Sequence, residues 1–150
     1  MPHFTLGCDP QSGGPLITAV LNVSEPRAKA LTAAGQAVAQ QVPIRGLIDT
    51  GASGTCIDPA LLTALGLSPS GNTLCHTPST GATPHSADLY DVSLRVYSDL
   101  NQPSLYFATL PVMASELFAA QGIHALIGRD VLSSCMLMYN GTLRLFTLAF

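Results

Sequence analysis

The sequence predicts a mainly β domain that carries roughly three or four short helices. About seven short segments are rich in the β-branched and aromatic residues that strands favour. The chain also has 13 Gly and 11 Pro, so turns interrupt it often. Its length of 150 residues suits one domain with its own core, and neither a linker nor an internal repeat divides it. We therefore treat residues 1–150 as a single domain.

A strand and a peripheral helix are predicted near the N-terminus. Leu16–Val23 is short, apolar and β-branched, and it follows a Gly-Gly-Pro turn, as a strand would. Ser24 can cap a helix that Gly35 can end. Because this Ala-rich segment is only weakly amphipathic, we expect a helix insertion over about residues 25–35 at the periphery of the domain.

The next strand leads directly into a glycine-containing loop. Val42–Ile48 has strand character, and residues 49–55 contain two glycines that a regular element would not tolerate. A short helix is predicted after this loop. Asp58 can cap it, Pro59 suits its first turn, and Gly66 can end it.

The second half of the chain is predicted to consist of strands and short helices around a hairpin. Residues 68–86 are dense in Ser, Thr, Pro and Gly, which predicts a mobile hairpin tip around residues 79–82. Asn140-Gly141 is typical of two-residue hairpin turns. The other strands are expected at 73–77, 87–97, 105–113, 124–127, 136–139 and 143–150, and the short helices at 115–121 and 129–134.

Composition excludes several functional classes. The 6 Lys and Arg residues are scattered and the formal net charge is −3, which argues against nucleic-acid binding. No apolar run approaches the length of a membrane span, and the N-terminus lacks a signal-peptide pattern, so we expect a cytoplasmic protein. No cofactor or metal is predicted, because no residues have zinc-ligand spacing. Reduced thiols are expected at Cys8, Cys56, Cys75 and Cys135.

The loop after the second strand places an acid at the end of an apolar segment. Asp49 follows Leu-Ile, and its apolar surroundings would disfavour the ionised carboxylate. Gly51 lets a second backbone or a substrate approach closely, and the Thr50 hydroxyl can bridge to a neighbouring main chain. An ordinary turn is the alternative interpretation. By residue frequencies, however, this combination is expected in about one chain in a thousand.

Two motifs resemble those of the retropepsin-like aspartic proteases, including bacterial members. In that family Asp-Thr-Gly-Ala follows two apolar residues, as residues 49–52 do here. An apolar pair, Gly, Arg, Asn or Asp, an apolar residue and Leu then follow near the C-terminus. The corresponding stretch here is Leu126-Ile127-Gly128-Arg129-Asp130-Val131-Leu132. The resemblance covers about residues 16–150, with a flap-like hairpin between the two motifs.

The resemblance implies a single-lobe acid protease fold, a closed β-barrel that pairs as a homodimer. It also implies an aspartic endopeptidase acting on peptide or protein substrates. Because the chain has one Asp-Thr-Gly, Asp49 of each of two chains would form the dyad that activates water. The flap would span residues 79–83. The resemblance assigns loop support to Thr50, Gly51 and Ala52, substrate or flap contacts to Ser53, Thr80, Gly81 and Ala82, and a structural motif to Gly128, Arg129 and Asp130.

Several alternatives stay open at this point. The chain could be a non-catalytic dimerisation or peptide-binding module with the same fold. Asp58 could partner Asp49 within one chain, although its capping role is the better interpretation. In viral relatives an acid often pairs with the motif arginine, and Ser53 stands at that position here. Apolar residues 143–150 are a candidate dimer surface. A serine hydrolase is disfavoured, because His3, His76, His85 and His124 each stand alone.

Overall fold

The computed structural model describes residues 1–76, 83–98, 103–117 and 119–150. The predicted flap residues Thr80, Gly81 and Ala82 lie outside this part of the chain. None of the described helices has the length and the apolar character needed to cross a lipid bilayer.

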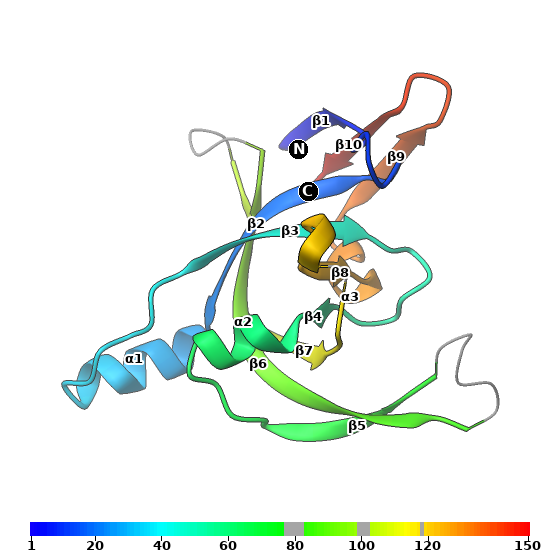
Figure 1. The fold of residues 1–150 in the computed structure, drawn as a ribbon. Helices are drawn as coiled ribbons and strands as arrows, with labels where there is room; N and C mark the ends of the chain where they lie inside the picture. The colour runs from blue at the N-terminus through cyan, green and yellow to red at the C-terminus, as the bar shows by residue number, and fades with distance from the viewer. Residues whose placement is uncertain (77–82, 99–102, 118) are drawn as a thin grey trace.

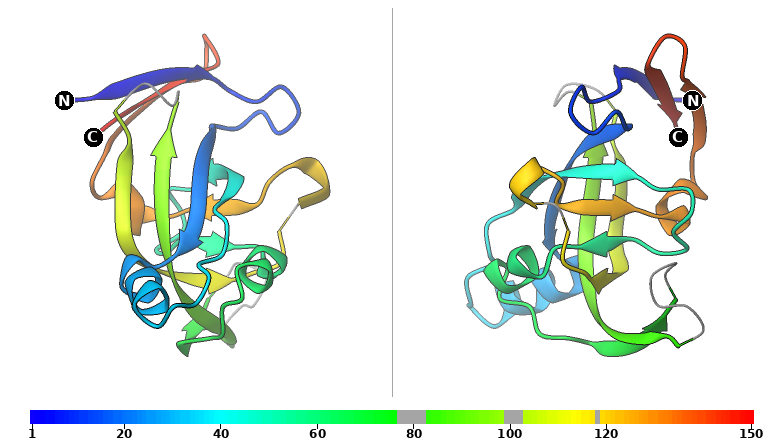
Figure 2. Two further views of the ribbon diagram at one scale, coloured as in Figure 1. Left: turned by 90° about the vertical axis from the view of Figure 1, so that its left-hand side faces the viewer. Right: turned by 45° about the vertical axis from the view of Figure 1, so that its right-hand side comes forward.

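Most of the chain forms a closed β-barrel that contains both antiparallel and parallel strand pairs (Figures 1 and 2). Neighbouring strands are hydrogen-bonded in the order β2-β3-β8-β4-β7-β6, and β2 also pairs with β6, which closes the ring. Within the described residues, strand β5 pairs with β6 alone and extends the sheet beyond the ring. The fold is therefore mainly β and barrel-like, as predicted. The strands are β2 (Leu16–Val23), β3 (Val42–Ile48), β4 (Cys56–Ile57), β5 (Gly71–Cys75), β6 (His85–Tyr97), β7 (Leu105–Ala114) and β8 (Ala125–Ile127).

A separate three-stranded sheet brings the two termini together (Figure 1). Its order is β1 (His3–Gly7), β10 (Leu145–Ala149) and β9 (Met136–Asn140), with both pairings antiparallel. Strand β10 therefore lies in the middle of this sheet, and Phe146 and Leu148 are buried within the same chain.

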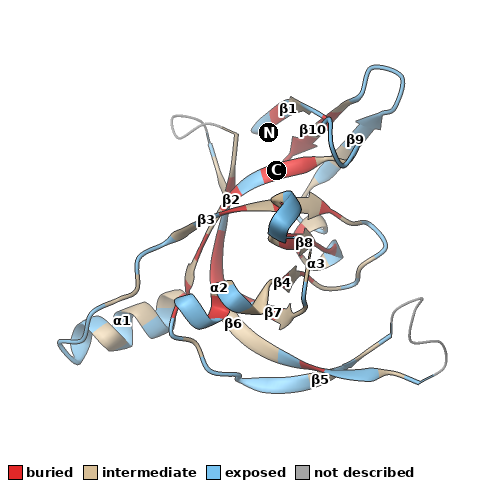
Figure 3. Cartoon of the chain, viewed as in Figure 1, coloured by how far each residue is buried: buried red, intermediate tan, exposed pale blue. Residues whose placement is uncertain are grey.

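One apolar core holds the barrel and this sheet together (Figure 3). Strand β2 alternates buried and more exposed positions along its C-terminal half, as expected where one face of a strand meets the core. The largest fully buried side chains come from strands of both sheets and from one helix. They include Ile17, Leu21, Ile44, Ile57, Leu62, Leu94, Ile127, Phe146 and Leu148.

Short helices connect the strands and follow local sequence signals. Helix α1 (Glu25–Ala33) has no buried residue and projects from the barrel (Figure 1), and Gly35 ends it with a φ of 68°. Helix α2 (Pro59–Ala64) begins where the Asp58 side chain accepts a hydrogen bond from the Ala60 N–H at 3.0 Å. The predicted cap at Asp58 is thus confirmed. The other helices are α3 (Arg129–Leu132) and the 3₁₀ turn η1 (Ala119–Gln121).

Two local predictions are wrong. The loop between β9 and β10 spans residues 141–144 and is not a two-residue turn, since Asn140 pairs with Leu145. Within this longer loop, the Asn140 side chain accepts a hydrogen bond from the Leu143 N–H at 3.0 Å. Arg144, the last loop residue, has a φ of 51°. A helix was also expected over 115–121, but residues 115–117 are irregular and only η1 is helical in the described part.

Candidate active site

Asp49 stands at the end of β3 with its carboxylate turned into its own loop. Its N–H donates to the Ile127 carbonyl at 3.0 Å, which ties the strand end to β8. One carboxylate oxygen, Oδ1, accepts hydrogen bonds from the Gly51 N–H at 2.9 Å and the Ala52 N–H at 3.3 Å. Among the described residues, no protein group donates to the other oxygen, Oδ2. The half-buried carboxylate is therefore fixed in direction and keeps one oxygen available.

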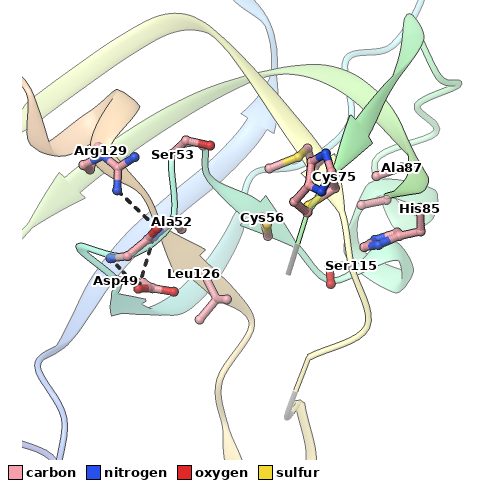
Figure 4. Close-up of a pocket in the computed structure, with 15 residues that line it drawn as sticks. Asp49, Ala52, Ser53, Cys56, Cys75, His85, Ala87, Ser115, Leu126 and Arg129 are labelled. Carbon is pink, nitrogen blue, oxygen red and sulfur yellow. Dashed lines mark hydrogen bonds between the residues drawn. The ribbon is translucent and has the colours of Figure 1, made fainter. Parts of the chain in front are cut away.

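Arg129 holds this loop through its carbonyl groups. Its Nη1 donates to the Thr50 carbonyl at 2.9 Å and to the Gly51 carbonyl at 3.1 Å, and its backbone N–H donates to the Ala52 carbonyl at 3.0 Å. Figure 4 shows Arg129 beside the loop at Ala52. Arg129 is therefore paired with main-chain carbonyls of the loop. Ser53 is an exposed residue at the edge of the loop.

Asp130 anchors the other end of the loop. Its carboxylate accepts from the Thr55 N–H and from the Thr55 hydroxyl, both at 2.8 Å. The same hydroxyl oxygen accepts a hydrogen bond from the Gly128 N–H at 3.1 Å. Because Thr55 is buried, these bonds satisfy polar groups that would otherwise be costly to remove from water. The two sequence motifs therefore form one hydrogen-bonded unit.

A close approach requires glycine at position 128 of this unit, and a tighter than usual contact is found at Gly51. A Cβ at Gly128 would lie 2.5 Å from the carbonyl carbon and oxygen of Gly54, and real Cβ atoms do not come that close to backbone. A Cβ at Gly51 would lie 3.1 Å from the Asp49 Oδ1 that its N–H binds. A side chain at Gly128 would push the loop away from α3, whereas a side chain at Gly51 would require the Asp49 carboxylate to shift by a few tenths of an ångström.

A cavity of about 410 Å³ opens beside Asp49 (Figure 4). The loop that carries Asp49 and Ser53 forms one side of it, and β5 and β6 form the opposite side. Leu126 and Met113 add apolar surface from β8 and β7. Its volume suits several side chains of a peptide, and Asp49 is the only carboxylate among the described residues that line it.

Burial raises the pKa of the Cys56 thiol in this cavity to about 11, with smaller electrostatic contributions from Cys75, Asp130 and Asp49, so the thiol is a neutral group. Cys56 is therefore not an activated nucleophile at neutral pH. No cluster of three or more His, Cys, Asp or Glu in the described ranges has an arrangement that could hold a metal ion. Asp49 is thus the carboxylate of the described lining that could take part in general acid–base chemistry.

A family model described as "Aspartyl protease" matches residues 24–131, a span that contains both motifs of the candidate site. The chain belongs to the aspartyl protease family. Its structure is similar to the crystal structure of a retropepsin-like aspartic protease from Rickettsia conorii, with a TM-score of 0.59 and 14% sequence identity. The alignment covers 99% of this chain and 90% of that one. The retropepsin-like fold is therefore confirmed. No curated protein matches the sequence.

The sequence predicts that the four histidines of this aspartyl protease stand alone, but two of them line the cavity that contains Asp49. His3 lies on β1, and His124 accepts a hydrogen bond from the Arg45 N–H through Nδ1, so neither reaches the cavity. His76 and His85, which were interpreted as ordinary loop residues, both line the cavity. In the sequence, His76 and His85 lie at similar distances on either side of the predicted hairpin tip. This spacing could have indicated that they lie close together, since Cys75 pairs with His85.

Proposed function

We propose that this aspartyl protease chain is an endopeptidase that acts as a homodimer, with Asp49 of each copy forming the catalytic dyad. The observation that carries the proposal is an Asp49 carboxylate with one oxygen held by its loop and the other unbonded at the cavity. Hydrolysis by this chemistry needs two carboxylates that share one proton. The described cavity lining has one, so a second copy would supply the other.

In the proposed reaction the ionised carboxylate removes a proton from water as the water attacks the scissile carbonyl. The protonated carboxylate donates a hydrogen bond to that carbonyl oxygen and stabilises the charge that develops there. The N–H groups of Gly51 and Ala52 hold Oδ1, which directs Oδ2 towards the cavity. Arg129 and Asp130 act as positioning residues, because they hold the loop and do not touch the carboxylate.

We place the dimer surface on β9, the edge strand of the terminal sheet. Residues 143–150 were the predicted surface, but β10 is covered on both edges by β1 and β9. In β9, Met136, Met138 and Tyr139 are exposed by 53%, 59% and 54%, which is unusual for adjacent large apolar residues on an unpaired edge. In Figures 1 and 2, β9 and the β3–β4 loop lie on the same side of the molecule. Antiparallel pairing of β9 with its copy would have two-fold symmetry.

The variant Met138→Lys tests this assembly together with the activity. Pairing of β9 strands would bring the two introduced lysines close together, so we expect a monomer in sedimentation velocity and a loss of peptidase activity of at least about tenfold. Because Met138 is exposed, the thermal midpoint measured on the monomer should change little.

The matched control is Leu74→Lys, which adds the same charge at an exposed apolar residue of β5, far from β9 (Figure 1). We expect this control to sediment as a dimer. A Met138→Lys protein that remains dimeric would contradict the β9 interface. A strictly monomeric protein with full activity would contradict the shared dyad.

A non-catalytic peptide-binding or dimerisation module is the second candidate function. The same cavity and the same edge strand would serve such a module. The carboxylate of Asp49 favours the enzyme, because binding alone has no need of an acid held with one oxygen unbonded. Substitution of Asp49 separates the two candidates.

A further inference from the structure

The cavity next to Asp49 is richer in basic groups than the chain as a whole. With His counted among the basic types, the sequence has 10 basic residues (6 Lys and Arg plus 4 His) against 9 Asp and Glu. The described cavity lining has three basic residues, Arg129, His76 and His85, against one carboxylate, Asp49. A peptide in this cavity would therefore meet an excess of basic side chains.

Both histidines belong to the wall that faces the catalytic loop. His85 begins β6 and pairs with Cys75, the last residue of β5, and His76 follows directly. Both imidazoles are exposed, and Figure 4 shows His85 across the cavity from Asp49. Both histidines therefore line the cavity on the wall opposite the loop that carries Asp49.

Within the described cavity lining, Asp49 is the only acid near these imidazoles. Strand β7 contributes Met113 and Ala114, Ser115 follows it, and β8 contributes Leu126; none of these residues carries a charge. The other ionisable groups in the lining are Arg129 on α3, the neutral Cys56 thiol on β4, Cys75 on β5, and Asp49, which the dyad uses. Neither His76 nor His85 forms an ion pair within the described part of the chain. The pair is thus open to a carboxylate from outside.

We propose that His76 and His85 form a subsite for an acidic side chain, so that the enzyme selects peptides with Glu or Asp next to the scissile bond. This inference rests on the proposed endopeptidase function. A histidine ring N–H can donate a hydrogen bond to a carboxylate oxygen, and this bond is charge-assisted when the ring is protonated. Arg129 adds positive potential while its Nη1 holds the loop.

Two peptides that differ only in Glu or Gln beside the scissile bond test the proposal. We expect kcat/KM to favour the Glu peptide by about tenfold near pH 5.5. The double variant His76→Gln/His85→Gln should lose this preference while it still cleaves the Gln peptide. The charge-reversed variant His85→Glu should prefer a Lys peptide. Equal kcat/KM for Glu and Gln near pH 5.5, or an unchanged preference in the double variant, would overturn the subsite.

Failure of the subsite can be separated from failure of the proposed function. If neither peptide is cleaved, the endopeptidase proposal fails, and the subsite is then tested by binding. Fluorescence anisotropy with the same pair of peptides, made uncleavable by a reduced amide bond, should show tighter binding of the Glu peptide near pH 5.5. Equal affinities of the two uncleavable peptides would overturn the subsite without reference to turnover.

Discussion

Asp49→Asn is expected to lower peptide hydrolysis by about 10³-fold or more while the fold is kept. Asparagine has the same shape, and its carbonyl oxygen can still accept the hydrogen bonds that Gly51 and Ala52 donate to Oδ1. It cannot take a proton from water, so the dyad loses its base. The measurement is the cleavage rate of a denatured protein and of a peptide library from acidic to neutral pH, with the thermal midpoint as a check on folding.

Asp58→Asn is the matched control for this substitution. Asp58 is the next acid along the chain, and it caps α2 by accepting from the Ala60 N–H. Asparagine caps helices about as well as aspartate, so activity and thermal midpoint should both stay at the wild-type level. Equal cleavage by the Asp49→Asn and wild-type proteins would exclude the aspartic mechanism. Wild-type protein that cleaves nothing but binds peptides would favour the binding module.

Gly128→Ala is expected to have the largest effect on stability, a loss of about 3 kcal/mol in the free energy of unfolding. The φ of Gly128 is −86°, which alanine adopts easily, so the cost comes from space and not from backbone conformation. The added methyl group would meet the Gly54 backbone at 2.5 Å. Because Gly54 precedes Thr55, the shift would also disturb the Asp130 contacts and lower activity.

Gly71→Ala provides the control for Gly128→Ala. A Cβ at Gly71, in β5, has no atom within 4 Å, so we expect the free energy of unfolding to change by less than about 0.5 kcal/mol. Urea unfolding at one fixed protein concentration measures both variants, since a dimer gains stability with concentration. A Gly128→Ala protein as stable as the wild type would show that α3 and the loop do not pack as described.

The parts of the fold that the sequence predicts correctly are those with local signals. Strands Leu16–Val23 and Val42–Ile48 have the predicted bounds, because β-branched runs between turn residues determine them. Helices α1 and α2 end shortly before Gly35 and Gly66, which have φ values of 68° and 64°. The two motifs were found for the same reason, since each is a continuous run of residues.

The parts that were missed depend on contacts between distant segments. Strand β1 exists because β10, at the other end of the chain, pairs with it, and the two-residue strand β4 is held between β7 and β8. The side chain of Arg129 binds backbone carbonyls, and every residue type has such a carbonyl, so the sequence does not indicate which residues are its partners. His76 and His85 reach the cavity only because β5 and β6 form its far wall. Pairings of this kind cannot be read from local sequence patterns.

The central claim is that Asp49 of two chains forms one catalytic dyad, and a mixing titration tests it most directly. Wild-type and Asp49→Asn chains are combined at constant total concentration, and subunit exchange is verified by native mass spectrometry. If both carboxylates are needed, mixed dimers are inactive and activity follows the square of the wild-type fraction. An equal mixture would then retain about one quarter of the wild-type activity. Retention of about one half, with activity proportional to the wild-type fraction, would show that each chain acts alone and would contradict the shared dyad.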